Sequence, residues 1–310
     1  MKRREFLQRA TAFGFLAAMP SAVSRLVAGS RPAGAPAGAE GHEPGARPRP
    51  LTPPAQGSVP VAFLVSPGAV VIDFCGPWEV FQDVMIPGRM DHPFDLYIVA
   101  ESTEPIRLSG GLTIVPEYTL ESAPAPKVLV IPAQRGRSEA MLAWIRKAAK
   151  GADVTMSVCT GAFLLARTGL LANRAATTHH DSYKQFAMEY PAVRLKRGAR
   201  FVEDGNLASA GGLTSGIDLA LRVVERYYGS DVAKKTAYYM EYQGQGWLNP
   251  AANEVYASVA VSTDAHPLCL ACSMEVDKAT APKSAYKGKA YYFCSQEHKE
   301  LFDKAPARYI

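Results

Sequence analysis

The sequence predicts an α/β fold: a doubly wound, mainly parallel sheet with helices on both faces, followed by a small C-terminal metal-binding module. Between residues 58 and 262, short apolar segments typical of buried strands alternate with helical segments. The 310 residues are enough for one full α/β domain and a smaller unit. After residue 264, Cys and His residues recur with the spacing of metal ligands.

Composition and charge limit the class of protein. Hydrophobic residues make up 48% of the chain and charged residues 20%, as in globular proteins. Most of the formal net charge of +5 lies within residues 1–30, so the rest of the chain is almost neutral. A nearly neutral body argues against nucleic-acid binding. Five cysteines, two in the body and three near the end, do not resemble a disulfide framework.

The N-terminal segment predicts export. Residues 1–29 contain Arg3 and Arg4, followed by Phe6 and Leu7 and by an apolar run that is too short to span a bilayer. This pattern favours a twin-arginine signal peptide and a periplasmic destination, with a general secretory signal as the alternative. We expect no stable membrane anchor. Residues 30–57, rich in Pro, Ala and Gly, predict a disordered linker.

The body begins with an apolar strand over residues 59–65. Asp73 is predicted in the loop after this strand, and Pro77 in the first turn of the next helix. An acidic residue in that position is either a helix cap or a carboxyl group that faces a pocket. Further strands are predicted at 94–100 and 128–131, a hairpin at 107–115, an amphipathic helix at 137–150, a helix at 181–190, short strands at 194–197, 201–203 and 207–209, and a helix at 217–228.

Cys159 lies between an apolar strand at 153–158 and an apolar helix at 161–171. Gly161 gives room for a sharp turn, as in a nucleophile elbow with Cys in place of Ser. The amides at the helix N-terminus would favour a thiolate, so we expect the pKa of this thiol to lie below about 8.5. The alternative is a small cysteine buried in the core.

Two histidines follow another predicted strand end. His179 and His180 are adjacent and would point to opposite faces of a strand, so at most one can reach the thiol. Ligands of parallel sheets gather at the carboxyl ends of the strands, where Asp73, Cys159 and His179 are all predicted. The pair Gly211-Gly212 lacks the other residues of a phosphate-binding loop.

Four segments of the body resemble the ThiJ/PfpI superfamily, whose fold is similar to class I glutamine amidotransferase domains. Asp73 and the pair Cys159-Thr160 are similar to the isonitrile hydratase branch, which in turn resembles domains of AraC-type regulators. The protease-like branch has His after the cysteine, so Thr160 argues against peptidase activity. The four segments are Ile72-Asp73-Phe74-Cys75-Gly76-Pro77-Trp78-Glu79-Val80-Phe81, Val158-Cys159-Thr160-Gly161-Ala162, Ala176-Thr177-Thr178-His179 and Ser209-Ala210-Gly211-Gly212-Leu213-Thr214-Ser215-Gly216-Ile217-Asp218.

The resemblance implies a lyase that acts on a small molecule without a cofactor in the main domain, and a homodimer. Cys159 would attack the terminal carbon of an isonitrile, Asp73 would transfer the proton, and the amides of Thr160 and Gly161 would stabilise the developing charge. Water would then release an N-substituted formamide. The resemblance also makes His179 catalytic and places Gly76, Gly161 and Gly212 in the substrate pocket. One departure is Ala133-Gln134, which stands where the family usually has a Gly-Gly pair.

The tail, residues 264–310, resembles the YHS domain, a metal-associated module. Its potential ligands have the spacing C-x₂-C-x₂₁-C-x₃-H, which suits a tetrahedral site for zinc, copper(I) or iron: Cys269, Cys272, Cys294 and His298. A module of this size has a small core, so a metal would help it to fold. The alternative is a docked tail whose cysteines are incidental or paired in a disulfide.

Three functions follow from these patterns. The first is a hydratase that works through Cys159. The second is a periplasmic metal- or redox-responsive protein that binds a ligand without turnover. The third, a fragment of a transcription regulator, is disfavoured by the predicted export signal. An activated thiolate serves the first two functions equally well.

Overall fold

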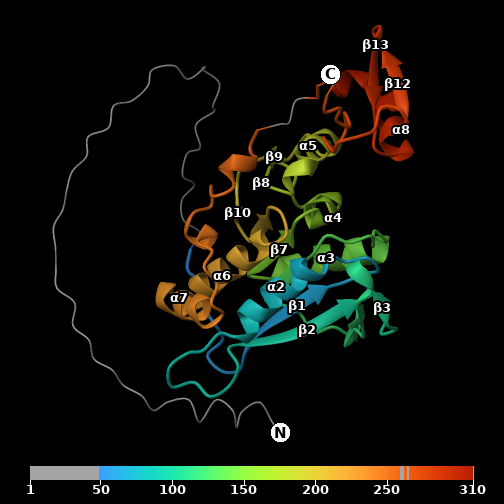
Figure 1. The fold of residues 1–310 in the computed structure, drawn as a ribbon. Coiled ribbons are helices and arrows are strands. Elements are labelled where there is room, and N and C mark those ends of the chain that lie inside the picture. Colours follow the sequence, from blue (N-terminus) through green and yellow to red (C-terminus); the bar gives the residue numbers. More distant parts are fainter. Residues whose placement is uncertain (1–48, 259–261, 264, 310) are drawn as a thin grey trace, which may run out of the picture. The chain divides into compact units, whose positions relative to one another are not determined.

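The computed structural model describes residues 49–258, 262–263 and 265–309 (Figure 1). A seven-stranded sheet in the order β10-β11-β7-β6-β1-β2-β5 forms the body. All neighbouring strands are parallel except β10 and β11. The strands are β1 (Val59–Leu64), β2 (Phe94–Ala100), β5 (Tyr118–Thr119), β6 (Val128–Ile131), β7 (Val154–Val158), β10 (Phe201–Asp204) and β11 (Leu207–Ala210).

Helices cover both faces of this sheet, as predicted. Side chains of β1 alternate between two hydrophobic clusters, Val61 and Phe63 in one and Ala62 and Leu64 in the other. The first cluster includes side chains from α2 (Val71–Gln82), α6 (Ser215–Tyr228) and α7 (Ser230–Tyr239). The second includes side chains from α3 (Glu139–Gly151), α4 (Gly161–Arg167) and α5 (Tyr183–Glu189).

The helix α3 illustrates how local sequence sets these boundaries. Ser138 caps it, because its hydroxyl accepts the Met141 N–H at 3.1 Å. Glu139 in the first turn and Lys150 in the last turn both suit the helix dipole. Met141 and Ile145, one turn apart, are buried against the sheet. The helix therefore forms close to its predicted bounds, 137–150.

The strands at 94–100 and 128–131 have the predicted bounds, and the predicted hairpin at 107–115 is present as antiparallel β3 (Ile106–Arg107) and β4 (Thr113–Ile114). Of the predicted strand at 194–197, only β9 (Arg194–Leu195) forms, and it pairs with β8 (Ala175–Ala176). The helix α7 was not predicted.

The prediction for the first loop was wrong in two respects. Asp73 lies in the first turn of α2 rather than in the loop before it, and Pro77 lies inside that helix rather than in its first turn. The helix begins at Val71, whose N–H is satisfied by the Ser109 hydroxyl at 3.0 Å. Because Pro77 has no N–H, α2 continues through it without one backbone hydrogen bond. The helix itself therefore fixes the position of the Asp73 carboxyl group.

The C-terminal unit has its own small core. The antiparallel strands β12 (Lys283–Tyr286) and β13 (Lys289–Tyr292) precede α8 (Gln296–Lys304). Phe302 of α8 packs against Phe293, with ring centroids 5.2 Å apart. The other buried side chains of this core are Cys269, Ala271, Cys272, Val276 and Tyr309. Two predicted metal ligands, Cys269 and Cys272, thus belong to the core of this unit, and Cys294 packs against it.

The predicted signal peptide and most of the predicted linker lie outside the described residues. Residues 49–57 contain no helix or strand, and Leu51 donates its N–H to the Arg226 carbonyl at 2.7 Å. The end of the predicted linker is therefore attached to α6. Among the helices that the structure describes, none combines the length and the apolar character that a membrane span requires.

Candidate active site and metal cluster

Cys159 occupies the sharp turn between β7 and α4 that the sequence predicts. Its φ of 57° lies in the left-handed region, where a residue other than Gly is strained. Two hydrogen bonds hold it there: its N–H donates to the Gly211 carbonyl at 2.9 Å, and its carbonyl accepts the Thr178 hydroxyl at 3.0 Å. Only 7% of the surface of Cys159 is exposed to solvent. The backbone is thus fixed in the conformation of a nucleophile elbow.

Gly161 is required by a close backbone approach. A Cβ at this position would lie 2.2 Å from the Ile131 carbonyl oxygen and 2.8 Å from the Pro132 carbonyl oxygen. Neither backbone atom can move without shifting β6 or the loop after it. The contact lets the first turn of α4 pack directly on the end of β6.

We expect Gly161→Ala to lower the free energy of unfolding by about 3 kcal/mol, the upper end of the usual cost of overpacking. Urea unfolding monitored by circular dichroism measures this loss. The matched control is Gly151→Ala at the end of α3, where an added Cβ would meet no atom within 4 Å. Equal stability of the two variants would contradict the requirement for glycine at residue 161.

Hydrogen bonding by three donors lowers the pKa of the Cys159 thiol: the backbone N–H groups of Leu213 and Thr160 and the Thr160 hydroxyl. Each stabilises a thiolate. Burial opposes them, and together with the nearby Asp73 carboxylate it raises the pKa of Cys159 to about 11. The expectation of a thiol pKa below about 8.5 is therefore wrong for this structure. Desolvation of the sulfur outweighs the helix terminus, and the resting side chain is a thiol.

Asp73 is fully buried, and its carboxyl group makes one hydrogen bond to the part of the chain that the structure describes. Its Oδ2 accepts the Ala133 N–H at 3.0 Å, while its Oδ1 has no hydrogen-bond partner among the described residues. Desolvation raises the pKa of this carboxyl group to about 7, against the opposing effect of the Ala133 hydrogen bond. A carboxyl group with this pKa can accept and return a proton at neutral pH.

The segment after β6, which departs from the family pattern, supports Asp73 directly. The Ala133 N–H binds the Asp73 carboxylate, so it is engaged before any substrate arrives. The Gln134 amide donates to the Leu64 carbonyl at 2.9 Å, and the Gly136 N–H donates to the Ser66 hydroxyl at 2.8 Å. The donors that act on the Cys159 sulfur come from Thr160 and Leu213 instead.

The prediction that the two histidines point to opposite faces of a strand was wrong: they lie at the start of a short 3₁₀ helix, His180–Ser182, and their rings share one side. His179 and His180 stack with ring centroids 4.5 Å apart, and His180 stacks in turn on Tyr256 at 4.8 Å. His179 Nδ1 accepts the Asp181 N–H at 3.3 Å, and His180 Nδ1 lies 3.0 Å from Asp181 Oδ1. Burial is the main cause that lowers the pKa of His179. These contacts orient both rings toward Asp181, and the catalytic role of His179 stays a prediction.

The other predicted pocket glycines pack closely against neighbouring side chains. A Cβ on Gly212 would lie 2.7 Å from His179 Cδ2, and a Cβ on Gly76 would lie 2.9 Å from Ile217 Cγ1. Gly76 therefore allows α2 and α6 to approach each other. Leu213, next to Gly212, was not predicted as a site residue. Its contribution is a backbone N–H, which any residue other than proline supplies, so the sequence gives no signal for it.

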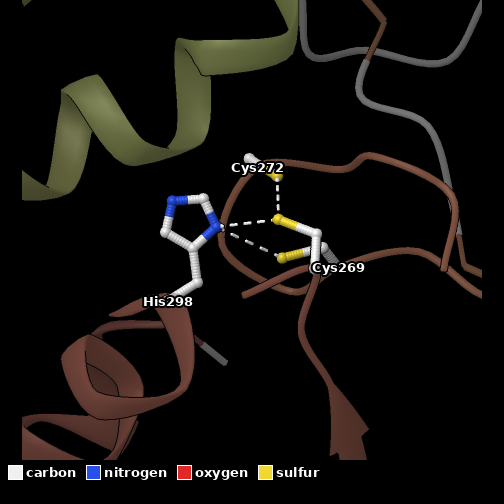
Figure 2. A group of neighbouring side chains, drawn as sticks. Cys269, Cys272 and His298 are labelled. Atoms are coloured by element: carbon white, nitrogen blue, oxygen red, sulfur yellow. Dashed lines mark hydrogen bonds between the residues drawn. The ribbon is translucent and has the colours of Figure 1, made fainter. Parts of the chain in front are cut away.

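The four predicted metal ligands come together in the C-terminal unit. Their ligand atoms all lie within 4.8 Å of one another. Cys272 Sγ is 3.5 Å from Cys294 Sγ, and His298 Nδ1 is 3.1 Å from Cys294 Sγ and 3.7 Å from Cys269 Sγ. In Figure 2 the His298 ring faces the cysteine sulfurs.

The distances of 3.5 and 3.7 Å fit a tetrahedral ion, and the 3.1 Å between Cys294 and His298 is somewhat shorter than such an ion would set. Metal–ligand bonds of about 2.3 Å to sulfur and about 2.0 Å to nitrogen place ligands roughly 3.5–3.8 Å apart. The hydrogen bond from Cys272 lowers the pKa of the Cys269 thiol, and the bond to Cys269 raises the pKa of His298. Three sulfurs and one imidazole form a soft donor set, which suits zinc, copper(I) or iron better than calcium or magnesium.

A surface cavity of about 1150 Å³ lies elsewhere on the body. It is formed by the segment after α2 and by α7 and the residues that follow it, including Met85, Ile86, Lys234, Tyr238 and Tyr239. Cys159, Asp73 and Thr160 do not line it. The buried thiol site is therefore distinct from this cavity.

Comparisons with known proteins agree with this geometry. Isonitrile hydratase of Pseudomonas putida is 33% identical over 187 residues, which are 59% of this chain and 78% of that protein. The HTH-type transcriptional regulator CdhR of Pseudomonas aeruginosa is 28% identical over 55% of this chain and 51% of its own length. Among solved structures, a ThiJ/PfpI family protein from Pseudomonas syringae superimposes with a TM-score of 0.54 and 30% identity, covering 61% of this chain and 77% of that one.

More distant structures share the fold. Drosophila melanogaster DJ-1beta has a TM-score of 0.52 at 18% identity, over 59% of this chain and 98% of that one. The model of the DJ-1/PfpI family matches residues 59–226, and the YHS domain model matches residues 270–310. The chain, with its buried cysteine at the strand–helix turn, therefore belongs to the DJ-1/PfpI family and carries a C-terminal YHS domain.

Proposed function

We propose that this protein is a cysteine-dependent hydratase that converts an isonitrile into an N-substituted formamide. The observation that carries the proposal is the pairing of a buried thiol with a buried carboxyl group whose pKa is raised to about 7. Such a carboxyl group can move protons at neutral pH, and the thiol can form a covalent bond. The similarity to isonitrile hydratase over 187 residues supports the choice of substrate.

The first half of the reaction is an addition to the isonitrile carbon. Because the resting group is a thiol, Asp73 takes its proton as the Cys159 sulfur attacks the terminal carbon. The carboxyl group then returns this proton to the same carbon, which gives a thioimidate. Donors from Thr160 and Leu213 stabilise the sulfur while it carries negative charge.

The second half releases the product. Water adds to the thioimidate carbon as Asp73 takes one of its protons and passes it to the substrate nitrogen, which gives a tetrahedral adduct. Asp73 then takes the hydroxyl proton of this adduct as the carbon–sulfur bond breaks, the N-substituted formamide leaves, and Asp73 returns the proton to the Cys159 sulfur. The overall change is the addition of one water molecule, so the reaction needs no oxidant, reductant or cofactor.

The test is formamide production by the purified full chain over a panel of alkyl and aryl isonitriles, followed by gas chromatography. Turnover that is lost on blocking Cys159 supports the proposal. The second candidate, a metal- or redox-responsive protein that binds a ligand without turnover, is favoured by the Cys/His cluster of the C-terminal unit. No turnover on any substrate, with oxidation of Cys159 to a sulfenic or sulfinic acid, would favour that candidate.

We propose that the C-terminal unit binds one transition-metal ion through Cys269, Cys272, Cys294 and His298. We expect about one equivalent of zinc, copper or iron after gentle purification, and a loss of at least 10-fold in affinity in Cys294→Ser. Elemental analysis and a chelator competition measure both quantities. Cys75→Ser, a cysteine on α2, is the control. Metal-free protein with a disulfide between Cys272 and Cys294, whose sulfurs lie 3.5 Å apart, would contradict the proposal.

We also propose that the folded protein is exported to the periplasm through the twin-arginine route, on the evidence of residues 1–29. Replacing Arg3 and Arg4 together by Lys should retain the protein in the cytoplasm, because that route recognises the arginine pair. Cell fractionation and immunoblotting measure the distribution. Arg9→Lys, outside the pair, is the matched control. Normal export of the double variant would rule this route out.

A further inference from the structure

The loop from Gly211 to Thr214 must be held in place to serve the thiol. It joins β11 to α6 and carries Leu213, whose N–H is one of the donors to the Cys159 sulfur. Leu213 has a φ of 32°, a value that side-chain-bearing residues rarely adopt. A strained backbone persists only where surrounding contacts fix it.

Arg200 contacts this loop at both ends. Its carbonyl accepts the Gly211 N–H at 2.9 Å, and its Nη2 donates to the Thr214 hydroxyl at 2.9 Å. The Gly211 carbonyl in turn accepts the Cys159 N–H at 2.9 Å. A single residue is therefore hydrogen-bonded to both ends of the loop and, through Gly211, connected to the backbone of the nucleophile.

The guanidinium group of Arg200 is itself held on several sides. Asp218, which is fully buried, accepts from Arg200 Nε at 2.6 Å and from the Tyr242 hydroxyl at 2.9 Å through the same Oδ2 atom. Asn253 Oδ1 accepts from Arg200 Nη1 at 3.3 Å. A Cβ on Gly246 would lie 2.9 Å from Arg200 Nε, so the backbone at Gly246 packs closely against the ion pair between Arg200 and Asp218.

We propose that Arg200 is a positioning residue that holds the loop from Gly211 to Thr214 so that the Leu213 N–H faces the Cys159 sulfur. The planar guanidinium can bind Asp218, Asn253 and Thr214 at once, which a lysine ammonium on a flexible stem does not reproduce. The inference rests on Cys159 as the reactive group of the proposed function, and it adds a residue that acts through the backbone of the loop.

Two variants test the inference in the full chain. Thr214→Val removes the hydroxyl that Arg200 binds but leaves the ion pair with Asp218. Arg200→Lys keeps the positive charge but loses the planar guanidinium group and its several N–H donors. The readout is the pH profile of Cys159 alkylation by iodoacetamide, followed on the Cys159 peptide by mass spectrometry. Loss of one donor to a charged sulfur should raise the apparent thiol pKa and slow alkylation at pH 8 by roughly 3–10-fold.

The control is Arg222→Lys, which alters an arginine of α6 that binds Glu203 and Glu225, away from the loop. It should lower Tm without moving the alkylation profile. Profiles of Arg200→Lys and Thr214→Val that match the wild-type profile would overturn the proposal, whatever their Tm. If Arg200→Lys does not fold, Thr214→Val decides alone. Because alkylation needs no isonitrile, a failure of the proposed reaction is distinguished from a failure of this inference.

Discussion

Cys159→Ala should abolish isonitrile hydration, with a loss of more than about 10⁴-fold in kcat/KM, because the proposed step is covalent and no other group can replace the sulfur. The thermal stability should change little, since Ala fits the small buried site. Initial rates of formamide release, measured at substrate concentrations well below KM, give the ratio. A thioimidate adduct on the wild-type Cys159 peptide, trapped by acid quench, would identify the intermediate directly.

Cys75→Ala is the matched control for this substitution. Cys75 is half-buried on α2 and packs against the core on the face that also contains Cys159. The same chemical change at Cys75 should leave the rate within a few-fold of the wild-type rate. Equal activity of the two variants and the wild type would remove Cys159 from the reaction and the hydratase proposal with it.

Asp73→Asn should lower kcat by roughly 10²–10⁴-fold, the usual contribution of general acid–base catalysis. An amide can still accept the Ala133 N–H, so the geometry of the loop should persist. In the wild type, kcat/KM should rise as the pH passes through about 7, where the Asp73 carboxylate forms and can take the thiol proton. Asp73→Asn should lose this inflection. A retained inflection would assign it to another group.

The same substitution should make the protein more stable at neutral pH. The pKa of Asp73 is about 7 in the folded chain, whereas an aspartate in an unfolded chain has a pKa of about 3.9. Between these values the folded state binds more protons than the unfolded state, so the free energy of unfolding falls as pH rises. The difference corresponds to roughly 4 kcal/mol above pH 7.

Asp73→Asn removes this destabilisation, since an amide does not ionise. Its Tm should therefore exceed that of the wild type at pH 8, and the two values should converge as the pH falls toward 4. Thermal unfolding at several pH values checks the sign. A variant that is less stable than the wild type at pH 8 would show that the carboxylate is better solvated than its burial indicates.

Much of the fold could be predicted because it rests on local patterns. Apolar runs gave β2 and β6 with the observed bounds, and Gly161 after Cys159 gave the sharp turn. The helix α7 was missed because its ten residues include Lys234 and Lys235 and only a narrow buried face. Asp73 was assigned to a loop because Pro77 suggested a helix start, whereas the backbone tolerates that proline inside α2.

The details of the site depend on contacts between residues that are far apart in the sequence, which local sequence patterns do not predict. The sequence shows that Cys159 precedes a helix, but the pKa of the thiol is decided by how deeply the fold buries the sulfur. Leu213 contributes a backbone amide, and Arg200 binds Asp218 and Thr214, residues that are distant from it in the sequence. The Cys/His cluster was easier to predict, because Cys and His side chains with a fixed spacing carry their chemistry in the sequence itself.

The two edges of the main sheet limit how copies of this chain can associate. The edge strand β5 has only two residues, and the edge strand β10 carries Glu203 and Asp204, both engaged by arginines. Short or charged edges discourage another strand from pairing with them. The homodimer that we propose from the family resemblance would therefore form through helices and loops, without a continuous intermolecular sheet. The same edges protect the folded chain against strand-to-strand aggregation at high concentration.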